Sequence, residues 1–209
     1  MLPTDAETRY AAWLVDLDGT LYHHTPVKLA MAAELLLFGW GAVSTLRTFR
    51  HAHEELRATP STTALELSPF QRQLEHAAAT LGRPAGDVER VVREWMFERP
   101  LKWVARTKRR KLLDALGTFR ARGGKTALVS DYPAQGKLRA LGALELFELV
   151  VSNGEPGGPS QLKPDPEGYL SAASRLGVEP SKCLVIGDRD DADGAAARAA
   201  GMAFRKVGG

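Results

Sequence analysis

Five short apolar runs, rich in β-branched residues, constrain the fold of this chain more than any other feature. They occupy residues 12–16, 125–130, 147–152, 182–187 and 203–207. The first four are almost continuously apolar, which is typical of strands covered on both faces. Between the later runs lie three segments with a helical pattern, each ending in a glycine: 134–142, 165–177 and 191–201. This alternation predicts an α/β fold with a Rossmann-like parallel sheet core.

The segment between the first two runs is much longer than a crossover connection requires. It spans residues 17–124, whereas a crossover between parallel strands needs only about a dozen residues or more. No part of it has the pattern of a strand, so we expect helices there. A helix over 68–82 has Ser68 as its N-cap residue, Gln71 in the position that completes a capping box, and Gly82 at its end.

Two further helices are predicted before the second strand. Residues 87–99 place several apolar side chains on one helical face, and residues 106–124 form the helix that returns the chain to the sheet. We therefore predict an all-helical cap over residues 23–104. It is inserted into an α/β core that consists of residues 1–22 and 105–209.

The composition narrows the class of protein. The formal net charge is +3 and the isoelectric point about 9.1, a mildly basic balance that suits a small anionic substrate and is too weak to indicate nucleic-acid binding. Cys183 is the single cysteine, so no disulfide can form within the chain, which fits a reducing compartment. The N-terminal residues lack a signal-peptide pattern, and no stretch reaches the roughly 18 apolar residues of a membrane span. We expect a cytoplasmic protein without a membrane segment.

Polar residues follow the predicted strands at the point where each strand ends. Ligands of doubly wound parallel sheets bind at the carboxyl ends of the strands, so these side chains are expected to converge on one edge of the sheet. The residues concerned are Asp16, Asp18, Ser130, Asp131, Lys163, Asp188, Asp190, Asp191 and Asp193.

These side chains form two chemical sets. Converging carboxylates repel one another unless a cation lies among them, and a site with only oxygen donors favours Mg²⁺. The hydroxyl of Ser130, the ammonium of Lys163 and the free amides of a helix that begins near Pro133 predict an anion site. A second helix start, with Asp165 as N-cap and Pro166 in the first helical position, is expected beside Lys163. A cation site and an anion site next to a carboxylate nucleophile are typical of phosphoryl transfer.

Four motifs make the chain resemble the haloacid dehalogenase superfamily of phosphohydrolases. They are DLDGT (16–20), VSD (129–131), LKPDP (162–166) and GDRDDADGAAARAAGM (187–202). A lone DxDGT is a weak signal, whereas four motifs in the family's order, each at a predicted strand end, are a strong one. The resemblance covers the whole α/β core. The helical insertion corresponds to a cap of the first type, as in phosphoglycolate-phosphatase-like members.

The resemblance implies the chemical roles of the first motif. Asp16 would attack the phosphorus and form an aspartyl-phosphate. Asp18 would protonate the leaving-group oxygen and then deprotonate the water that cleaves the intermediate. Thr20 would order the turn. The family's dehalogenases lack the second aspartate, so Asp18 favours phosphate esters over carbon–halogen bonds.

The other motifs would bind the phosphoryl group and the metal. Ser130, the backbone amide of Asp131 and the ammonium of Lys163 would hold phosphoryl oxygens. Mg²⁺ would be bound by a side-chain oxygen of Asp16, the backbone carbonyl of Asp18 and the carboxylate of Asp188.

The last motif leaves one assignment open. The family has a second acid four or five residues after the first, and position 192 is an alanine. Asp193 fits the longer spacing and Asp191 is the alternative, whereas Asp190 is expected to face solvent.

These observations predict a Mg²⁺-dependent phosphatase that acts on a small phosphorylated metabolite. Two alternatives remain: a phosphomutase that passes the phosphoryl group to a sugar, and a non-catalytic binding protein of the same fold. The basic run KRRK (108–111) is interpreted as a solvated helix face, and His23 and His24 as surface residues. The glycine- and proline-rich loop 153–161 is either a plain surface loop or a segment that closes over the site.

Overall fold

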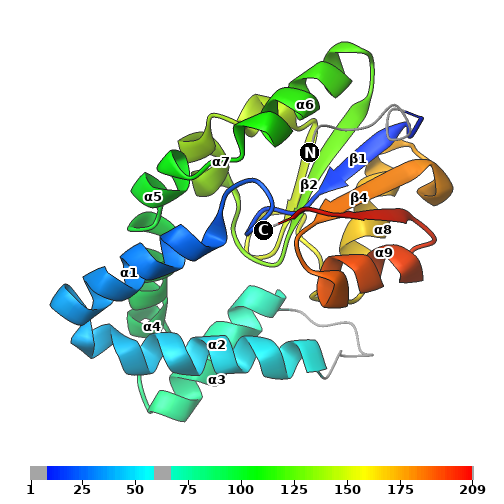
Figure 1. Cartoon of the computed structure of the whole chain (residues 1–209). Coiled ribbons are helices and arrows are strands. Elements are labelled where there is room, and N and C mark those ends of the chain that lie inside the picture. Colours follow the sequence, from blue (N-terminus) through cyan, green and yellow to red (C-terminus); the bar gives the residue numbers. More distant parts are fainter. Residues whose placement is uncertain (1–8, 59–66, 209) are drawn as a thin grey trace.

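The centre of the molecule is a five-stranded parallel sheet in the order β3-β2-β1-β4-β5 (Figure 1). The computed structural model describes residues 9–58 and 67–208. Its strands are β1 (Ala12–Val15), β2 (Lys125–Ser130), β3 (Leu149–Ser152), β4 (Cys183–Gly187) and β5 (Ala203–Lys206). All four pairings are parallel. The predicted α/β fold is confirmed, and the predicted strand ends are off by no more than two residues.

Helices cover both faces of this sheet. They are α6 (Arg110–Ala121), α7 (Gln135–Leu141), α8 (Glu167–Leu176) and α9 (Ala195–Ala199), with short turns η3 (Leu144–Leu146) and η4 (Pro180–Lys182). Successive residues of β1 point to opposite faces of the sheet and belong to different hydrophobic cores. Trp13 packs with α6 and α7, and Leu14 packs with α8 and α9. Trp13 stacks on Phe119 of α6 at 4.2 Å between ring centroids. Burial on both sides explains why the strand sequences are continuously apolar.

Within the described residues, the connection between β1 and β2 consists of helices joined by turns, with one isolated bridge. Its helices are α1 (His24–Phe38), η1 (Trp40–Ala42), α2 (Val43–Ala58), α3 (Pro69–Leu81), α4 (Ala85–Val92), η2 (Arg93–Glu98, a π-helical turn) and α5 (Leu101–Arg106). The expected capping box at Ser68 and Gln71 is present at the start of α3, and Gly82 ends that helix with a left-handed conformation. The predicted all-helical insertion is confirmed. In Figure 1, α1, α2 and α3 lie below the sheet, on the side of the carboxyl ends of its strands.

The two chain segments that join the helical region to the sheet lie side by side. Tyr22 and Lys108 form an isolated antiparallel bridge, and the amide of Arg109 donates to the carbonyl of Leu21. The KRRK run therefore begins in this junction, and helix α6 starts at Arg110 rather than at 106 as predicted. The boundaries of the cap, 23 and 104, stay a prediction that this junction supports.

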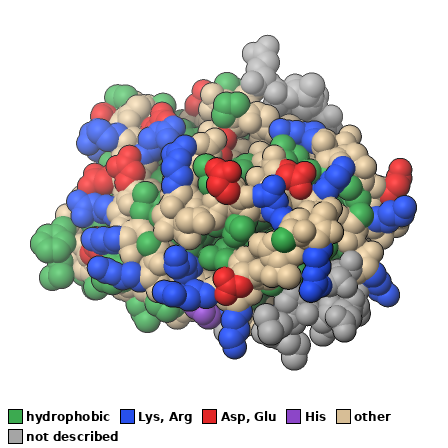
Figure 2. Space-filling view, turned by 90° about the horizontal axis from the view of Figure 1, so that it is seen from above, with side chains coloured by type: hydrophobic (Ala, Val, Ile, Leu, Met, Phe, Trp, Pro, Cys, Tyr) green, Lys and Arg blue, Asp and Glu red, His purple; other side chains and the backbone are tan. Residues whose placement is uncertain are grey.

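Positively and negatively charged side chains are mixed on the face drawn in Figure 2. Lys and Arg side chains lie there among those of Asp and Glu, with no large area of one charge.

Within the described residues, no single helix is long and apolar enough to cross a membrane. Helix α1 and the segment Trp40–Ala58 pass such a test only as a pair, and this pair is bent by 110°.

Candidate active site

A cavity of about 610 Å³ lies where the carboxyl ends of the strands face the helical region. Its wall on the sheet side contains most of the residues that the sequence singled out. These are Asp16, Asp18, Ser130, Asp131, Lys163, Asp188 and Asp193. Parallel strands bring the ends of β1, β2 and β4 to one edge, so residues far apart in the sequence share one cavity.

Asp16 is held from two sides. The ammonium of Lys163 lies 2.6 Å from Oδ1 of Asp16, and the hydroxyl of Thr20 donates to Oδ2 at 2.9 Å. Burial and the nearby carboxylate of Asp193 raise the pKa of Asp16 well above its usual range, although Lys163 opposes the shift. The side chain of Asp16 is therefore fixed in orientation, with Thr20 acting on the carboxylate itself as well as in the turn.

Lys163 is buried among anionic and polar oxygens. Its Nζ lies 2.8 Å from Oδ1 of Asp193 and donates to the carbonyl of Val129 at 3.0 Å. Burial alone would lower the pKa of Lys163, but the carboxylates of Asp16 and Asp193 raise it, so the group stays an ammonium. Lys163 thus places a buried positive charge between Asp16 and Asp193.

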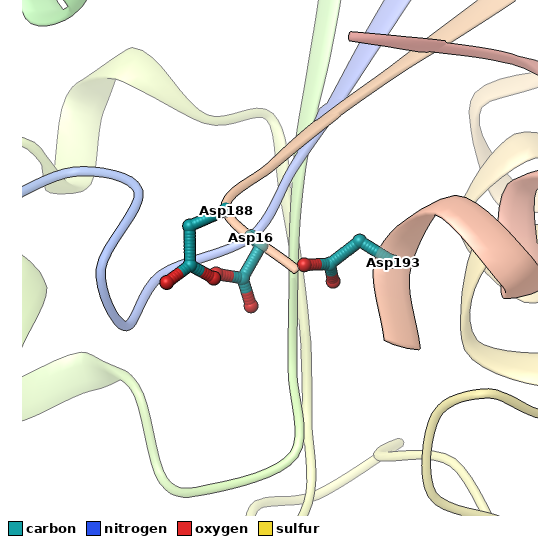
Figure 3. A group of neighbouring side chains, drawn as sticks. All are labelled: Asp16, Asp188 and Asp193. Carbon is teal, nitrogen blue, oxygen red and sulfur yellow. The ribbon is translucent and has the colours of Figure 1, made fainter. Parts of the chain in front are cut away.

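Three carboxylates could hold a cation. Asp16, Asp188 and Asp193 each offer an oxygen within 4.8 Å of the others, and Figure 3 shows their side chains gathered at the strand ends. Burial and the charge of Asp193 raise the pKa of Asp188, and the cations of Lys163 and Arg189 only partly offset this rise. A set of oxygen donors alone fits a hard divalent ion such as Mg²⁺.

Glycine makes room for the carboxylate of Asp188. Gly19 has φ +89°, and a Cβ there would lie 2.7 Å from Cγ of Asp188, closer than the about 3.5–4.0 Å of a normal carbon contact. The glycine of DLDGT therefore serves both the turn and the approach of the last motif.

The structure separates the three acids of the last motif. Asp193 is 2% exposed and accepts hydrogen bonds from the hydroxyl of Tyr169 at 2.8 Å and the amide of Arg189 at 3.2 Å. Asp191 pairs with Arg189 at the surface, and Asp190 pairs with Arg198. The geometry brings Asp193 into the cavity and leaves Asp191 outside it.

Asp18 has two partners that sequence reasoning missed. Lys137 of α7 donates to its two carboxylate oxygens at 2.6 and 2.8 Å, and the hydroxyl of Tyr22 donates to Oδ1. Burial raises the pKa of Asp18, but Lys137 and Tyr22 outweigh it and hold the pKa below its usual value. One feature of the sequence could have indicated Lys137: it lies on the same helical face as the buried apolar residues Ala134, Leu138 and Leu141, where a lysine is unusual.

The anion site differs from the prediction in one respect. Ser130 is buried, and its hydroxyl accepts from the amide of Tyr132. Helix α7 begins at Gln135 rather than near Pro133, and the amides of Ala134 and Gln135 donate to Glu155. These helix amides are therefore not free to bind an anion, because a carboxylate from loop 153–161 already satisfies them.

The residues around Lys163 are ordered by backbone contacts. The carboxylate of Asp131, whose pKa burial raises, accepts from the amide of Lys163 at 3.1 Å. Helix α8 begins at Glu167, one residue later than predicted, and Asp165 accepts from the amide of Glu167. The side chain of Asp131 thus holds the third motif in place.

The helical region forms the opposite wall of the cavity. His24, Trp95 and Phe97 line it, among others, so the interpretation of His24 as a surface residue was wrong, whereas His23 is exposed. The start of α1 turns His24 into the cavity, and burial lowers the pKa of His24 to about 4. His53 stacks on Tyr132 of the core, with 4.6 Å between the ring centroids.

Direct hydrogen bonds join the helical region to the core. Arg57 of α2 donates to the carbonyl of Lys163 at 2.8 Å. The start of α3 contacts the loop 153–161: the amide of Phe70 donates to the side chain of Asn153, and the guanidinium of Arg72 donates to the carbonyl of Ser160. This loop is therefore a contact surface between the two parts and not a plain surface loop.

Comparisons with known proteins agree with this arrangement. The chain matches the family model described as haloacid dehalogenase-like hydrolase over residues 10–201. It is 28% identical to the fructose-1-phosphate phosphatase YqaB of Escherichia coli (strain K12), over 93% of this chain and 94% of that protein. It is also 28% identical to the phosphoglycolate phosphatase of the same organism, over 89% of this chain and 76% of that protein.

Two further matches support less: one covers only a short part of the chain, and the other is a likeness of fold at low sequence identity. A match at 45% identity covers 28% of this chain and only 25% of the validoxylamine A 7'-phosphate phosphatase of Streptomyces hygroscopicus subsp. limoneus. The L-2-haloacid dehalogenase of Xanthobacter autotrophicus aligns with a TM-score of 0.64 at 18% identity, over 95% of this chain and 77% of that one. This structural likeness extends to the fold alone.

Proposed function

Because the chain belongs to the haloacid dehalogenase-like hydrolase family, we propose that it is a Mg²⁺-dependent phosphatase of a small phosphorylated metabolite. The observation that carries this proposal is the presence of two aspartates, Asp16 and Asp18, on one wall of the cavity. The fold does not separate phosphatases from dehalogenases, since an L-2-haloacid dehalogenase shares it. The names of two relatives that align along most of the chain, a fructose-1-phosphate phosphatase and a phosphoglycolate phosphatase, support the choice.

Asp16 is the proposed nucleophile. One of its oxygens would form a bond to phosphorus while the bond from phosphorus to the leaving-group oxygen breaks. Thr20 and Lys163 each bond one carboxylate oxygen, which fixes the plane of the carboxylate before the substrate arrives. Such preorganisation lowers the entropic cost of reaching the reactive geometry.

Asp18 is the proposed general acid and base. It would give a proton to the leaving-group oxygen and later take one from the water that attacks the aspartyl-phosphate. Lys137 stabilises its charged form. A dianionic phosphoryl group placed beside Asp18 would raise the pKa of Asp18, because like charges disfavour ionisation. The substrate itself would thus prepare the acid for its first task.

The remaining motif residues would bind the phosphoryl group. We assign its oxygens to the hydroxyl of Ser130, the ammonium of Lys163 and the backbone amide of Asp131. Lys163 would offset negative charge both on Asp16 and on the transferred group.

The metal would be held at the cluster around Asp16. We assign it to Asp16, Asp188 and the backbone carbonyl of Asp18, with Asp193 nearby. A bound Mg²⁺ would neutralise charge on the phosphoryl oxygens. The oxygen-only donor set, and the space that Gly19 leaves for Asp188, support the assignment.

Residues 23–104 are proposed to act as a cap. Their aromatic and methionine side chains face the catalytic wall across the cavity, where they would exclude water and contact the leaving group of the ester. The shape and polarity of these side chains would determine which leaving group the cavity accepts.

The test is phosphate release from a panel of sugar phosphates and phosphorylated hydroxy acids, with and without Mg²⁺. Asp16→Asn is expected to lower kcat at least about 1,000-fold, and Asp18→Asn about 100- to 10,000-fold. Asp190→Asn is the matched control, because this acid of the same motif pairs with Arg198 at the surface. Full activity of Asp16→Asn would overturn the proposal. Transfer of the phosphoryl group to a sugar rather than to water would indicate a mutase.

A further inference from the structure

Lys137 is a buried cation that the proposed mechanism does not yet use. It lies in α7, within the apolar stripe that packs this helix on the sheet, and only 8% of its side chain is exposed. Its ammonium contacts both oxygens of Asp18 and lies 5.9 Å from the ring centroid of Phe97 in the helical region. The group therefore sits where both walls of the cavity meet.

The fold itself does not require a lysine at this position. A buried ion pair commonly adds little or no stability over apolar residues of similar size, because both charges lose their hydration. The neighbours Leu138 and Leu141 are fully or almost fully buried, so an apolar side chain at 137 would extend the same stripe. Asp18 also keeps a second hydrogen-bond donor in Tyr22. These points indicate that the charge of Lys137 serves the cavity.

The two buried lysines lie at different ends of the cavity, and this placement indicates the role of Lys137. Lys163 is bound to Asp16, Asp193 and the carbonyl of Val129, at the end of the cavity where the phosphoryl group would bind. Lys137 lies at Asp18, at the end where the leaving-group oxygen would be protonated. An oxygen that is hydrogen-bonded to Asp18 would lie within about 5 Å of the Lys137 ammonium, close enough for direct contact after a small rotation of the side chain.

We propose that Lys137 is a further catalytic residue, whose ammonium contacts the leaving-group oxygen of the ester and offsets the negative charge that develops there. The proposal rests on the phosphatase function given above. As Asp16 bonds to phosphorus, the bond from phosphorus to the leaving-group oxygen breaks and its electron pair moves to that oxygen. The oxygen takes its proton from Asp18, and Lys137 keeps all of its own protons. Such a contact strengthens as the charge grows, so it acts on the transition state.

The test compares two esters whose leaving groups differ in basicity. The more basic the leaving-group oxygen, the more its departure depends on a cation or an acid that offsets its negative charge. Ethyl phosphate releases a strongly basic alkoxide, and p-nitrophenyl phosphate releases a weakly basic phenolate. Lys137→Met is expected to lower kcat/KM for ethyl phosphate about 10- to 100-fold, the range of a charged hydrogen bond. The value for p-nitrophenyl phosphate should fall less than about 3-fold, and Lys137→Arg should restore most of the activity on ethyl phosphate.

Two further variants separate this role from a structural one. Lys102→Met is the matched control, because it removes a lysine that pairs with Glu34 in the helical region and does not line the cavity. It should leave both esters unaffected. Lys137→Gln keeps a polar side chain and should show the same selective loss if Lys137→Met does not fold.

Equal losses on both esters, or no loss on either, would overturn the role of Lys137 while leaving the phosphatase function intact. If the unaltered protein releases phosphate neither from these two esters nor from the panel of sugar phosphates and phosphorylated hydroxy acids, both the role of Lys137 and the phosphatase function are overturned.

Discussion

Replacing Gly19 by alanine should remove activity without unfolding the protein. Gly19 has φ +89°, and an added Cβ would overlap the carboxylate of Asp188, with Cγ at 2.7 Å. The overlapping atoms belong to the end of a side chain, so Asp188 can turn away at little cost in free energy. The consequence is local: one oxygen ligand leaves the cluster at Asp16.

The expected magnitude has two parts. A left-handed backbone costs about 1–2 kcal/mol for a residue with a Cβ. For a chain of this size, 1 kcal/mol corresponds to about 2–4 °C in Tm, so Gly19→Ala should melt about 2–8 °C lower. Loss of a metal ligand should lower kcat/KM at least about 100-fold, since even altered partners of ligands cost 10- to 100-fold.

Gly82→Ala is the matched control for this experiment. Gly82 has φ +60° at the end of α3, and an added Cβ there meets no atom within 4 Å. It should lower Tm by a similar amount and leave phosphate release and its response to Mg²⁺ unchanged. Differential scanning calorimetry with and without Mg²⁺, together with steady-state kinetics, measures all of these quantities. A Gly19→Ala variant that keeps both activity and the Mg²⁺-induced rise in Tm would refute the reasoning.

Three further predictions concern charge. Mg²⁺ should raise Tm more at about pH 7.5 than at about pH 5. Burial raises the pKa values of Asp16 and Asp188, so a larger fraction of both acids is protonated at the lower pH, and protons compete with the cation. Equal rises at both pH values would contradict the assigned site. Lys163→Met leaves the buried Asp16 without its cation and should lower the free energy of unfolding by about 3–5 kcal/mol in urea titrations. Arg198→Met loses only a surface pair and should cost less than about 1 kcal/mol. Burial lowers the pKa of His24 to about 4, so its ring should titrate in NMR spectra near pH 4, and a midpoint near 6.5 would mean that the ring is solvated.

The sheet and the set of site residues could be predicted from the sequence because both depend on short segments. A buried parallel strand is a continuous apolar run, and the residue that follows it lies at the carboxyl end whatever the rest of the chain does. Asp16 and Asp188 follow β1 and β4 directly, and Ser130 is the last residue of β2. Their convergence therefore follows from the strand pattern and the parallel direction alone.

The choice among the acids of the last motif needed the structure. The π-helical turn η5 (Asp190–Gly194) follows β4. Asp191 and Asp193 lie two residues apart within this turn, so their side chains point to opposite sides of it: Asp193 lines the cavity and Asp191 pairs with Arg189 at the surface. Spacing counted along the sequence does not show which side of the turn faces the cavity.

The partners of the site residues also depended on tertiary packing. Lys137 reaches Asp18, and Arg57 reaches the backbone of Lys163, across 119 and 106 residues of sequence. Glu155 takes the amides that were expected to be free because loop 153–161 folds back onto the start of α7. The sequence by itself determined which residues stand at the strand ends, since strand pattern is local. Only the tertiary structure decided what those residues contact, since the packing of helices and loops sets distances between segments that no local pattern encodes.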